Sequence, residues 1–307
     1  MKLFYYERRD GFSNFGDQLN SWLWPQLLPE FFDEDETTSF IGIGTLLNQL
    51  LPQRVPQAKR LIIFSTGVGY EQPLKTLNSN WKIYCVRGRL SAQKLGLLTD
   101  LAITDGAILT RRLYQSSAPK KYKFTYIPHI HHATFAQEVW QRICTQIGFH
   151  YLDPRADVDK VLLTVTQTEV LLAEAMHGAI IADTLRVPWI PILTSPRILP
   201  FKWRDWCDSI QVKYSPYYLS PLVQSYPKYG RGIRSGIKAF GYWKNSLLQF
   251  PNLTQLWQEQ EELYGNQLLK IAKQGRQKLS LDSQLERLTV QLEEKLEVLK
   301  RVESSKL

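Results

Sequence analysis

The sequence predicts an α/β fold of two successive domains, followed by a C-terminal helical extension. Short apolar runs, each followed by a glycine-containing turn and a helical pattern, recur over residues 1–113 and begin again at residue 124. This order of elements is typical of parallel α/β sheets. The length of 307 residues suits two such domains. We therefore predict domains at 1–113 and 124–253, a polar linker at 114–123, and helices with a possible short coiled coil at 254–307.

Composition and charge narrow the classes of function. Hydrophobic residues make up 44% of the chain and charged residues 22%, which is ordinary for a folded protein with a sizeable core. The 38 Lys and Arg against 29 Asp and Glu give a formal charge of +9, which suits an anionic small molecule, nucleic acid or an acidic membrane surface. The three cysteines are odd in number and far apart, so they indicate neither a disulfide framework nor a zinc cluster.

The N-terminus and the apolar runs bear on location. The opening MKLFYYERRDG has no apolar stretch before a small-residue cleavage site, so no signal peptide is indicated. The longest apolar runs are far shorter than the roughly 20 residues that a membrane span needs. We expect a cytoplasmic protein whose contact with a membrane, if any, is peripheral at its inner face.

Five short apolar segments predict the strands of the first domain: residues 2–6, 40–43, 61–65, 82–86 and 101–104. Helices are expected around residues 22–28, from near Leu46, and over 91–95, where Ser91 is well placed to cap the helix. Five strand–turn–helix units of this kind predict a doubly wound domain whose loops gather at one edge of the sheet.

Four residues at these strand ends are candidates for a binding site. Asp17 lies where the first strand meets a helix and can cap that helix or face a ligand. Gly67 belongs to a TGVG turn that lets backbone approach a ligand closely. Arg87 follows the fourth strand, where its guanidinium could bind a carboxylate or phosphate or could simply lie on the surface. Asp105 follows the fifth strand.

The second domain begins with a strand at 124–127, followed by three histidines. His129, His131 and His132 in this pattern could bind a transition metal, but no nearby acidic residue or cysteine completes a ligand set. We therefore expect a substrate-facing loop, with His129 in it, and no metal. An amphipathic helix over 135–147 follows and ends at Gly148.

The stretch AEAMHGAIIAD at 173–183 places one histidine between a loop and a helix. We expect a tight turn at Gly178, with Met176 and His177 just before it, and a buried strand over 185–192 after the helix. In open α/β sheets such turns lie at the ligand crevice, and the free N–H groups of a helix start favour an anion there. The alternative is that His177 is a core residue whose hydrogen bonds are made to neighbouring protein groups.

Basic residues follow this stretch. Lys202 lies among Phe201, Trp203 and Trp206, a cluster that could hold an anion or form an aromatic surface. Residues 209–258 contain no acidic side chain, and their mixture of basic and aromatic residues suits an acidic membrane surface or an anionic polymer. Glycines and prolines there favour an irregular basic loop near the active edge over a stable helix. The segment matches no recognised nucleic-acid module, so we expect no nucleic-acid partner.

Leucines recur at helical spacing near the C-terminus, at positions 281, 285, 288, 292, 296 and 299. Lys295 interrupts this seam. The pattern predicts a docking helix or a short coiled coil that would join copies of the chain into a homo-oligomer.

Taken in order, the motifs resemble those of the polysaccharide pyruvyl transferase family over roughly residues 10 to 210. The His-Gly motif with its Ile-Ala-Asp helix is the most specific piece. The segments that carry the resemblance are SNFGDQLN, FIGIGTLL, IIFSTGVGY, VRGRLSAQKLG, ITDGAIL, YIPHIHHA, EAMHGAIIADTLRVP and FKWRDW. The resemblance implies a GT-B type architecture of two facing Rossmann-like domains.

The resemblance also implies an activity. Members transfer the pyruvyl group of phosphoenolpyruvate to a sugar, such as a lipid-linked oligosaccharide or exopolysaccharide precursor, forming a ketal across two hydroxyls and releasing phosphate. Phosphoenolpyruvate is then the donor substrate, and no cofactor is implied. By motif match, Arg87 and Lys202 are expected near the donor's anionic groups and His177 near the reacting centre. Members often carry Ser-Leu or Arg-Leu before the His-Gly, where this chain has Ala175-Met176.

This chemistry needs cations for a polyanionic donor, an acid for its methylene carbon and a base for the sugar hydroxyls. A histidine can act as either acid or base near neutral pH. We therefore expect His177 as the acid–base residue, Arg87 and Lys202 as donor clamps, and His129 lining the cleft. Two alternatives remain: a nucleotide-sugar glycosyltransferase of the same architecture, and a non-catalytic binding module, which Ala175 favours.

Overall fold

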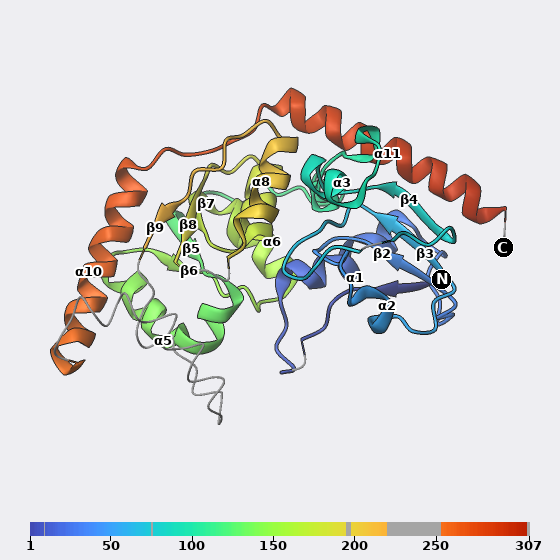
Figure 1. Cartoon of the computed structure of the whole chain (residues 1–307). Helices are drawn as coiled ribbons and strands as arrows, with labels where there is room; N and C mark the ends of the chain where they lie inside the picture. The colour runs from blue at the N-terminus through green and yellow to red at the C-terminus, as the bar shows by residue number, and fades with distance from the viewer. Residues whose placement is uncertain (9, 75, 195–197, 220–252, 306–307) are drawn as a thin grey trace.

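Two parallel β-sheets form the framework of the chain (Figure 1). The structure is a computed structural model that describes residues 1–8, 10–74, 76–194, 198–219 and 253–305. Within these residues the first sheet has four strands in the order β1-β2-β3-β4, and the second has five in the order β6-β5-β7-β8-β9. The mixed α/β class predicted from the alternating pattern is confirmed.

The first sheet comprises β1 (Lys2–Phe4), β2 (Thr38–Ile41), β3 (Arg60–Phe64) and β4 (Trp81–Cys85). Its helical segments are α1 (Phe15–Leu27), α2 (Leu51–Arg54), α3 (Arg89–Leu95), the 3₁₀ helices η1 (Thr99–Leu101) and η2 (Gly106–Leu109), and α4 (Thr110–Leu113). The strands lie in chain order, so the reversal that defines a doubly wound sheet does not occur among the described strands of this half. The prediction of a doubly wound first domain was wrong in this respect.

The second sheet comprises β5 (Tyr122–Ile127), β6 (His150–Tyr151), β7 (Thr168–Ala173), β8 (Trp189–Leu193) and β9 (Tyr217–Tyr218). Its helices are α5 (Ile130–Gln146), α6 (Val158–Thr166), α7 (Met176–Thr184) and α8 (Pro200–Ser209). Because β5 has β6 on one side and β7 on the other, the winding reverses at β5. In open α/β sheets, the crevice at such a reversal is where ligands bind.

The predicted fifth strand at 101–104 does not form. A single bridge joins Val86 to Ala102, and two backbone hydrogen bonds hold the segment at the edge of β4. The run stays short because η1 precedes it and because Asp105 then accepts the amide of Ala107 and starts η2. The apolar side chains that suggested a strand are used in this short edge segment instead.

The helix expected from Leu46 is also replaced by irregular backbone. The amide of Leu46 donates to Thr66 Oγ1 at 3.3 Å and that of Leu47 to the carbonyl of Gly67 at 3.2 Å. These bonds to the loop after β3 compete with helical ones. Both leucines are nevertheless buried, and the helix that follows, α2, has only four residues.

Two helices begin earlier than predicted. The N-cap of α1 is Asn14, and Asp17 lies in its first turn, so Asp17 is not the cap. The apolar positions Phe15, Leu19 and Leu23 recur every four residues and are all buried, which explains the early start. Similarly, α5 begins directly after His129, whose Nδ1 accepts the amide of His131.

The C-terminal helices flank both halves of the molecule. α10 (Leu253–Gln274) lies against α5, where Arg142 and Glu261 form an ion pair at 2.7 Å, and α11 (Asp282–Ser304) runs back over the first sheet (Figure 1). The side chains of the leucine seam are at most 3% exposed from Leu285 to Leu299, whereas Leu281 is 70% exposed. Most of the seam predicted to join copies of the chain is therefore covered by the chain's own first half.

Two expectations concern location and partners. No helix in the described part of the chain combines the length and apolarity of a membrane span. The basic stretch at 209–258 falls largely outside the described residues, so peripheral membrane contact stays a prediction.

Candidate functional site

The candidate site lies at the carboxyl ends of the strands, where the two halves of the chain meet. The reversal at β5 brings the segment after β5 next to the segment after β7, so that His129 and Glu174 are in contact. The loops after β1 and β3 approach the same region from the first half. Parallel-sheet topology predicts a ligand where such strand ends meet.

His177 faces an acidic partner from the other half of the molecule. It lies in the first turn of α7, and its Nε2 is 3.6 Å from Oδ2 of Asp105, beside η2. Both atoms are buried without a hydrogen-bond partner among the described residues. The Asp105 side chain is fully buried and that of His177 is 14% exposed. The two side chains are therefore within ion-pair distance across the junction of the two halves.

The other ring nitrogen of His177 lies against α1. A Cβ atom on Gly16 would come within 2.1 Å of Nδ1, far inside van der Waals contact. The glycine of the SNFGDQLN segment therefore leaves the space that the imidazole occupies. Gly16 was not among the predicted site residues, because the sequence does not reveal which side chain faces it across the two halves.

Among the described residues, no side chain caps the start of α7. Its N-cap is Ala175, which provides no side-chain hydrogen bond to the first turn. The amides at this end carry the partial positive charge of a helix N-terminus and suit an anionic group.

Two predicted neighbours of His177 have packing roles in the structure. Gly178 is inside α7 and forms no turn, which corrects the expectation, and a Cβ there would lie 2.9 Å from Ile127 of β5. Met176 is 4% exposed and belongs to the apolar core.

Glu174 is a residue of the site that sequence reasoning did not select. Its buried Oε2 accepts the backbone amide of His129 at 2.9 Å and lies 2.8 Å from Nδ1 of His132. Its Oε1 has no hydrogen-bond partner in the described residues. The one signal in the sequence was a glutamate directly after an apolar strand, where an acid is rarely buried without a specific use.

Positive charge gathers around this cluster. Burial lowers the pKa of His129 well below its usual range, and the charges of Lys202 and Arg8 act in the same direction. Burial raises the pKa of Asp17, against the opposing effects of its hydrogen bond from Asn14 and the charges of His177, Lys202 and Arg8. Lys202 thus lies within electrostatic reach of both Asp17 and His129, and Asp17 within reach of His177.

Lys202 extends from α8 to the first half of the chain. Its Nζ donates to the hydroxyl of Tyr70 at 2.6 Å and lies 4.8 Å from the centre of that ring. Trp203 and Trp206 on the same helix are fully buried and anchor it. Lys202 therefore has a fixed base and a partly exposed charged end.

Arg87 is engaged entirely by the protein. Its Nε pairs with Asp205 of α8 at 3.0 Å, and both side chains are fully buried. Its other nitrogens donate to Gly44 O, Thr45 Oγ1 and Val68 O at 2.8–3.1 Å. No face of this guanidinium is open to a ligand, so a direct donor contact stays a prediction, and the geometry instead ties the two halves together.

Two further residues complete this junction. Gly67 is required by packing, because a Cβ there would lie 2.4 Å from the Arg87 guanidinium carbon. Ser91 is not the cap of α3, since its hydroxyl donates to Asp205 and accepts the Val68 amide.

Within the described ranges, no group of three His, Cys, Asp or Glu side chains is arranged to hold a metal ion.

Comparison with known proteins identifies the family. The family model for polysaccharide pyruvyl transferase matches residues 14–196, which include Gly16, Asp105 and His177. The chain is 39% identical over 218 residues to the succinoglycan biosynthesis protein ExoV of Rhizobium meliloti (strain 1021), covering 70% of this chain and 67% of that protein. No solved structure matches. The chain, a transferase, therefore belongs to the polysaccharide pyruvyl transferase family, as the order of its motifs predicted.

Proposed function

We propose that the chain transfers the pyruvyl group of phosphoenolpyruvate to two hydroxyls of an exopolysaccharide precursor, with His177 as the acid–base residue. The observation that carries the proposal is the pair of His177 and the buried Asp105, which joins the two halves at the strand ends. The name of the ExoV relative supports a saccharide acceptor of the exopolysaccharide class. Both reactants are substrates, so this scheme requires no cofactor.

The donor is a dense polyanion, and the site has matching groups. The uncapped first turn of α7 offers backbone donors beside His177, and Lys202 offers an ammonium held by Tyr70. We assign the donor's carboxylate and phosphate to these groups. The meeting of strand ends from both halves at His177 supports a GT-B-like arrangement, in which donor and acceptor enter between two facing domains.

The reaction can be written as two steps. The protonated imidazole of His177 delivers a proton to the methylene carbon of the donor while the first sugar hydroxyl attacks the adjacent carbon, giving a phosphorylated hemiketal. The second hydroxyl then attacks the same carbon, the C–O bond to phosphate breaks, and inorganic phosphate leaves. Of the two hydroxyl protons released, one restores the proton of His177 and the other leaves with phosphate.

Asp105 and Arg87 support this scheme in different ways. Asp105 stabilises the imidazolium that donates the proton, and contact between Nε2 and Asp105 leaves Nδ1, beside Gly16, to exchange protons with the substrate. Arg87 is a positioning residue, because its pair with Asp205 fixes α8 and hence Lys202.

Calorimetric binding tests the donor assignment. We expect phosphoenolpyruvate to bind the wild-type chain, and Lys202→Ala to weaken that binding by about tenfold, corresponding to about 1.4 kcal/mol for one charge-assisted hydrogen bond. Lys94→Ala, which removes an exposed charge from α3, serves as the control and should bind like wild type. Binding of UDP or UDP-sugars in place of phosphoenolpyruvate would contradict the proposal and favour glycosyl transfer. Binding of neither ligand class would favour a non-catalytic module.

A further inference from the structure

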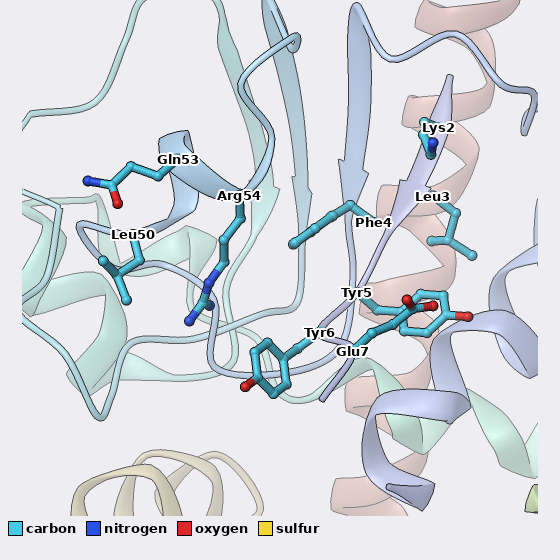
Figure 2. Close-up of a pocket in the computed structure, with 9 residues that line it drawn as sticks. All are labelled: Lys2, Leu3, Phe4, Tyr5, Tyr6, Glu7, Leu50, Gln53 and Arg54. Atoms are coloured by element: carbon cyan, nitrogen blue, oxygen red, sulfur yellow. The ribbon is translucent and has the colours of Figure 1, made fainter. Parts of the chain in front are cut away.

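A hollow runs along β1, at the edge of the first sheet. It has a volume of about 750 Å³ and is lined by β1, the residues that follow it and α2, as Figure 2 shows. A smaller hollow of about 270 Å³ shares Lys2, Phe4 and Arg54 with it. We call these two hollows, which share lining residues, the β1 groove.

The groove is linked to the candidate site through Arg8. Glu7, one of the lining residues, directly precedes Arg8 in the chain. The charge of Arg8 is felt by both Asp17 and His129 of the site. A chain-like ligand whose end lies at His177 could therefore continue into the β1 groove.

The larger hollow is lined by an exposed aromatic ring with a cation over it. Tyr6 is 37% exposed, and the guanidinium carbon of Arg54 lies 5.1 Å from its ring centre. Figure 2 shows the Arg54 side chain extending from α2 toward that ring. Among the described residues, no carboxylate lies within ion-pair distance of Arg54. The ring is thus held in place, and the guanidinium retains donors for a ligand.

The lining has both kinds of surface that a sugar chain requires. Sugar rings present apolar C–H faces and hydroxyl edges. Phe4 and Tyr6 supply aromatic surface on the side that faces α2, where Gln53 and Arg54 supply acceptors and donors, while Tyr5 and Glu7 extend to the other side of the strand (Figure 2). A peptide added to the edge of β1 would instead use backbone groups of a strand only three residues long. The side-chain chemistry favours a saccharide.

Two other exposed aromatic rings support the same reading. Phe12 is 37% exposed beneath Arg155, with 5.4 Å between cation and ring centre, and Tyr70 is 52% exposed beneath Lys202. Each pair joins a strand-end loop of the first half to a residue of the second half. Exposed aromatic–cation pairs therefore occur both at the junction of the halves and in the groove.

We propose that the β1 groove binds the acceptor oligosaccharide at sugar units beyond those that react. The ring of Tyr6 stacks on a sugar, and the guanidinium of Arg54 donates hydrogen bonds to sugar hydroxyls. This inference rests on the proposed function for its acceptor class. The occupant is a segment of the saccharide chain that extends from the reacting unit at His177. Affinity for the acceptor should then rise with its length.

The test measures acceptor affinity apart from chemistry. The probes are succinoglycan oligosaccharides of one and two repeating units, treated with mild acid to remove any ketal. Their binding is followed by calorimetry without donor, and their KM with phosphoenolpyruvate present. We expect the longer chain to bind wild type more tightly, and Tyr6→Ala to weaken its binding and raise its KM by about tenfold, at unchanged kcat and unchanged phosphoenolpyruvate affinity.

Two control variants distinguish loss of the Tyr6 ring from a general loss of folding or activity. Tyr6→Phe keeps the ring and should stay within about twofold of wild type, as should Leu98→Ala, which trims a 74% exposed side chain elsewhere in the first half. Equal binding of the long chain by wild type and Tyr6→Ala, or no binding by wild type, would overturn the groove assignment. Turnover retained in His177→Gln would instead contradict the proposed chemistry and leave the groove result standing, so the two failures are distinguishable.

Discussion

At the residue scale, Gly16 and His177 depend on each other. An alanine is normally favoured over glycine inside a helix by about 1 kcal/mol. Position 16 is helical, yet the space for a Cβ is taken by the imidazole. We interpret this glycine as a requirement of the site, because local helix stability alone would favour a larger residue.

Gly16→Ala is therefore expected to lose activity while the chain stays folded. The new methyl group would lie 2.1 Å from Nδ1 and must displace the imidazole from Asp105. Misplacing a reacting group by about 1 Å can reduce turnover by about a hundredfold. Turnover and circular dichroism should be measured together, with Ser21→Ala at an exposed position of the same helix as the control. Normal kcat in Gly16→Ala would contradict the placement of His177.

His129 gives a prediction about pH. Burial lowers its pKa below that of the unfolded chain, so the unfolded state binds more protons as the pH falls below about 6.5. The stabilising effect of keeping His129 neutral is thus fully present above that pH and is lost as the pH falls. We expect the free energy of unfolding to decrease from pH 7 to pH 5, with this residue contributing at most about 1.4 kcal/mol per pH unit.

Denaturant unfolding of His129→Gln between pH 5 and pH 7 measures this contribution. The free energy of unfolding should depend less steeply on pH in this variant than in wild type. Part of this pH dependence should remain, because burial also lowers the pKa of His150. An unchanged slope would rule out His129 as a neutral buried group.

Local spacing predicts which residues lie at strand ends but not which of them meet. Asp105 and His129 were predicted from their places at strand ends, which parallel topology gathers at one edge. His177 was predicted from a turn before a helix, and Lys202 from its aromatic neighbours and the family resemblance. Which residue faces which across the two halves is not encoded in local spacing. The contacts of Gly16 with His177 and of Arg87 with Asp205 therefore could not be predicted.

At the element scale, α8 is held in place by a buried ion pair. The carboxylate of Asp205 accepts hydrogen bonds from Nε of Arg87 and from the backbone amide of Ser91. It therefore joins α8 to α3 and to the end of β4. Gly88 permits this approach, since a Cβ there would lie 2.2 Å from the Asp205 carbonyl oxygen. The position of Lys202 follows from this attachment.

Removing one partner should be costly. Arg87→Met leaves Asp205 buried and unpaired, and we expect a loss of about 3–5 kcal/mol in the free energy of unfolding. The double variant Arg87→Met with Asp205→Leu should lose less than the sum of the single variants, because no charge is left buried. Chemical denaturation of all four proteins closes the cycle. Additive losses would mean that the two side chains do not act as a pair.

Strands were easier to predict than the segments between them. β3 and β4 are apolar runs with β-branched or aromatic residues, and their predicted positions agree with the structure to within about two residues. The segments at 46–50 and 101–104 also contain apolar residues, but hydrogen bonds from Leu46 to Thr66 and from Ala107 to Asp105 decide their backbone. Such tertiary and turn contacts override the local pattern.

At the scale of the whole molecule, α11 links the end of the chain to the first half. Its leucines pack on η2 and β4, and Arg112 pairs with Glu286 and Glu293 on its surface. The heptad-like spacing of the leucines correctly predicted a buried apolar face but not the surface that covers it. An amphipathic helix has the same pattern whether it packs on its own domain or on another chain.

Leu292→Ala distinguishes the two uses of that seam. Leu292 is fully buried, and truncation to alanine should lower the free energy of unfolding by about 2–5 kcal/mol. Val298→Ala on the same helix, where the side chain is 40% exposed, should change it by about 0.5 kcal/mol or less. Unfolding and sedimentation should be measured on the same samples. Dissociation of an oligomer without destabilisation would show that the seam joins separate chains.

The most direct test of the whole account is the fate of the donor's methylene group in heavy water. The chain should be incubated in D₂O with phosphoenolpyruvate and mild-acid-treated succinoglycan oligosaccharide, and the products analysed by mass spectrometry and NMR. We predict inorganic phosphate together with a pyruvyl ketal whose methyl group carries a single deuterium, and neither product with His177→Gln. A glycosyl-transfer product from a UDP-sugar in place of the ketal, or unchanged ketal formation by His177→Gln, would contradict the account.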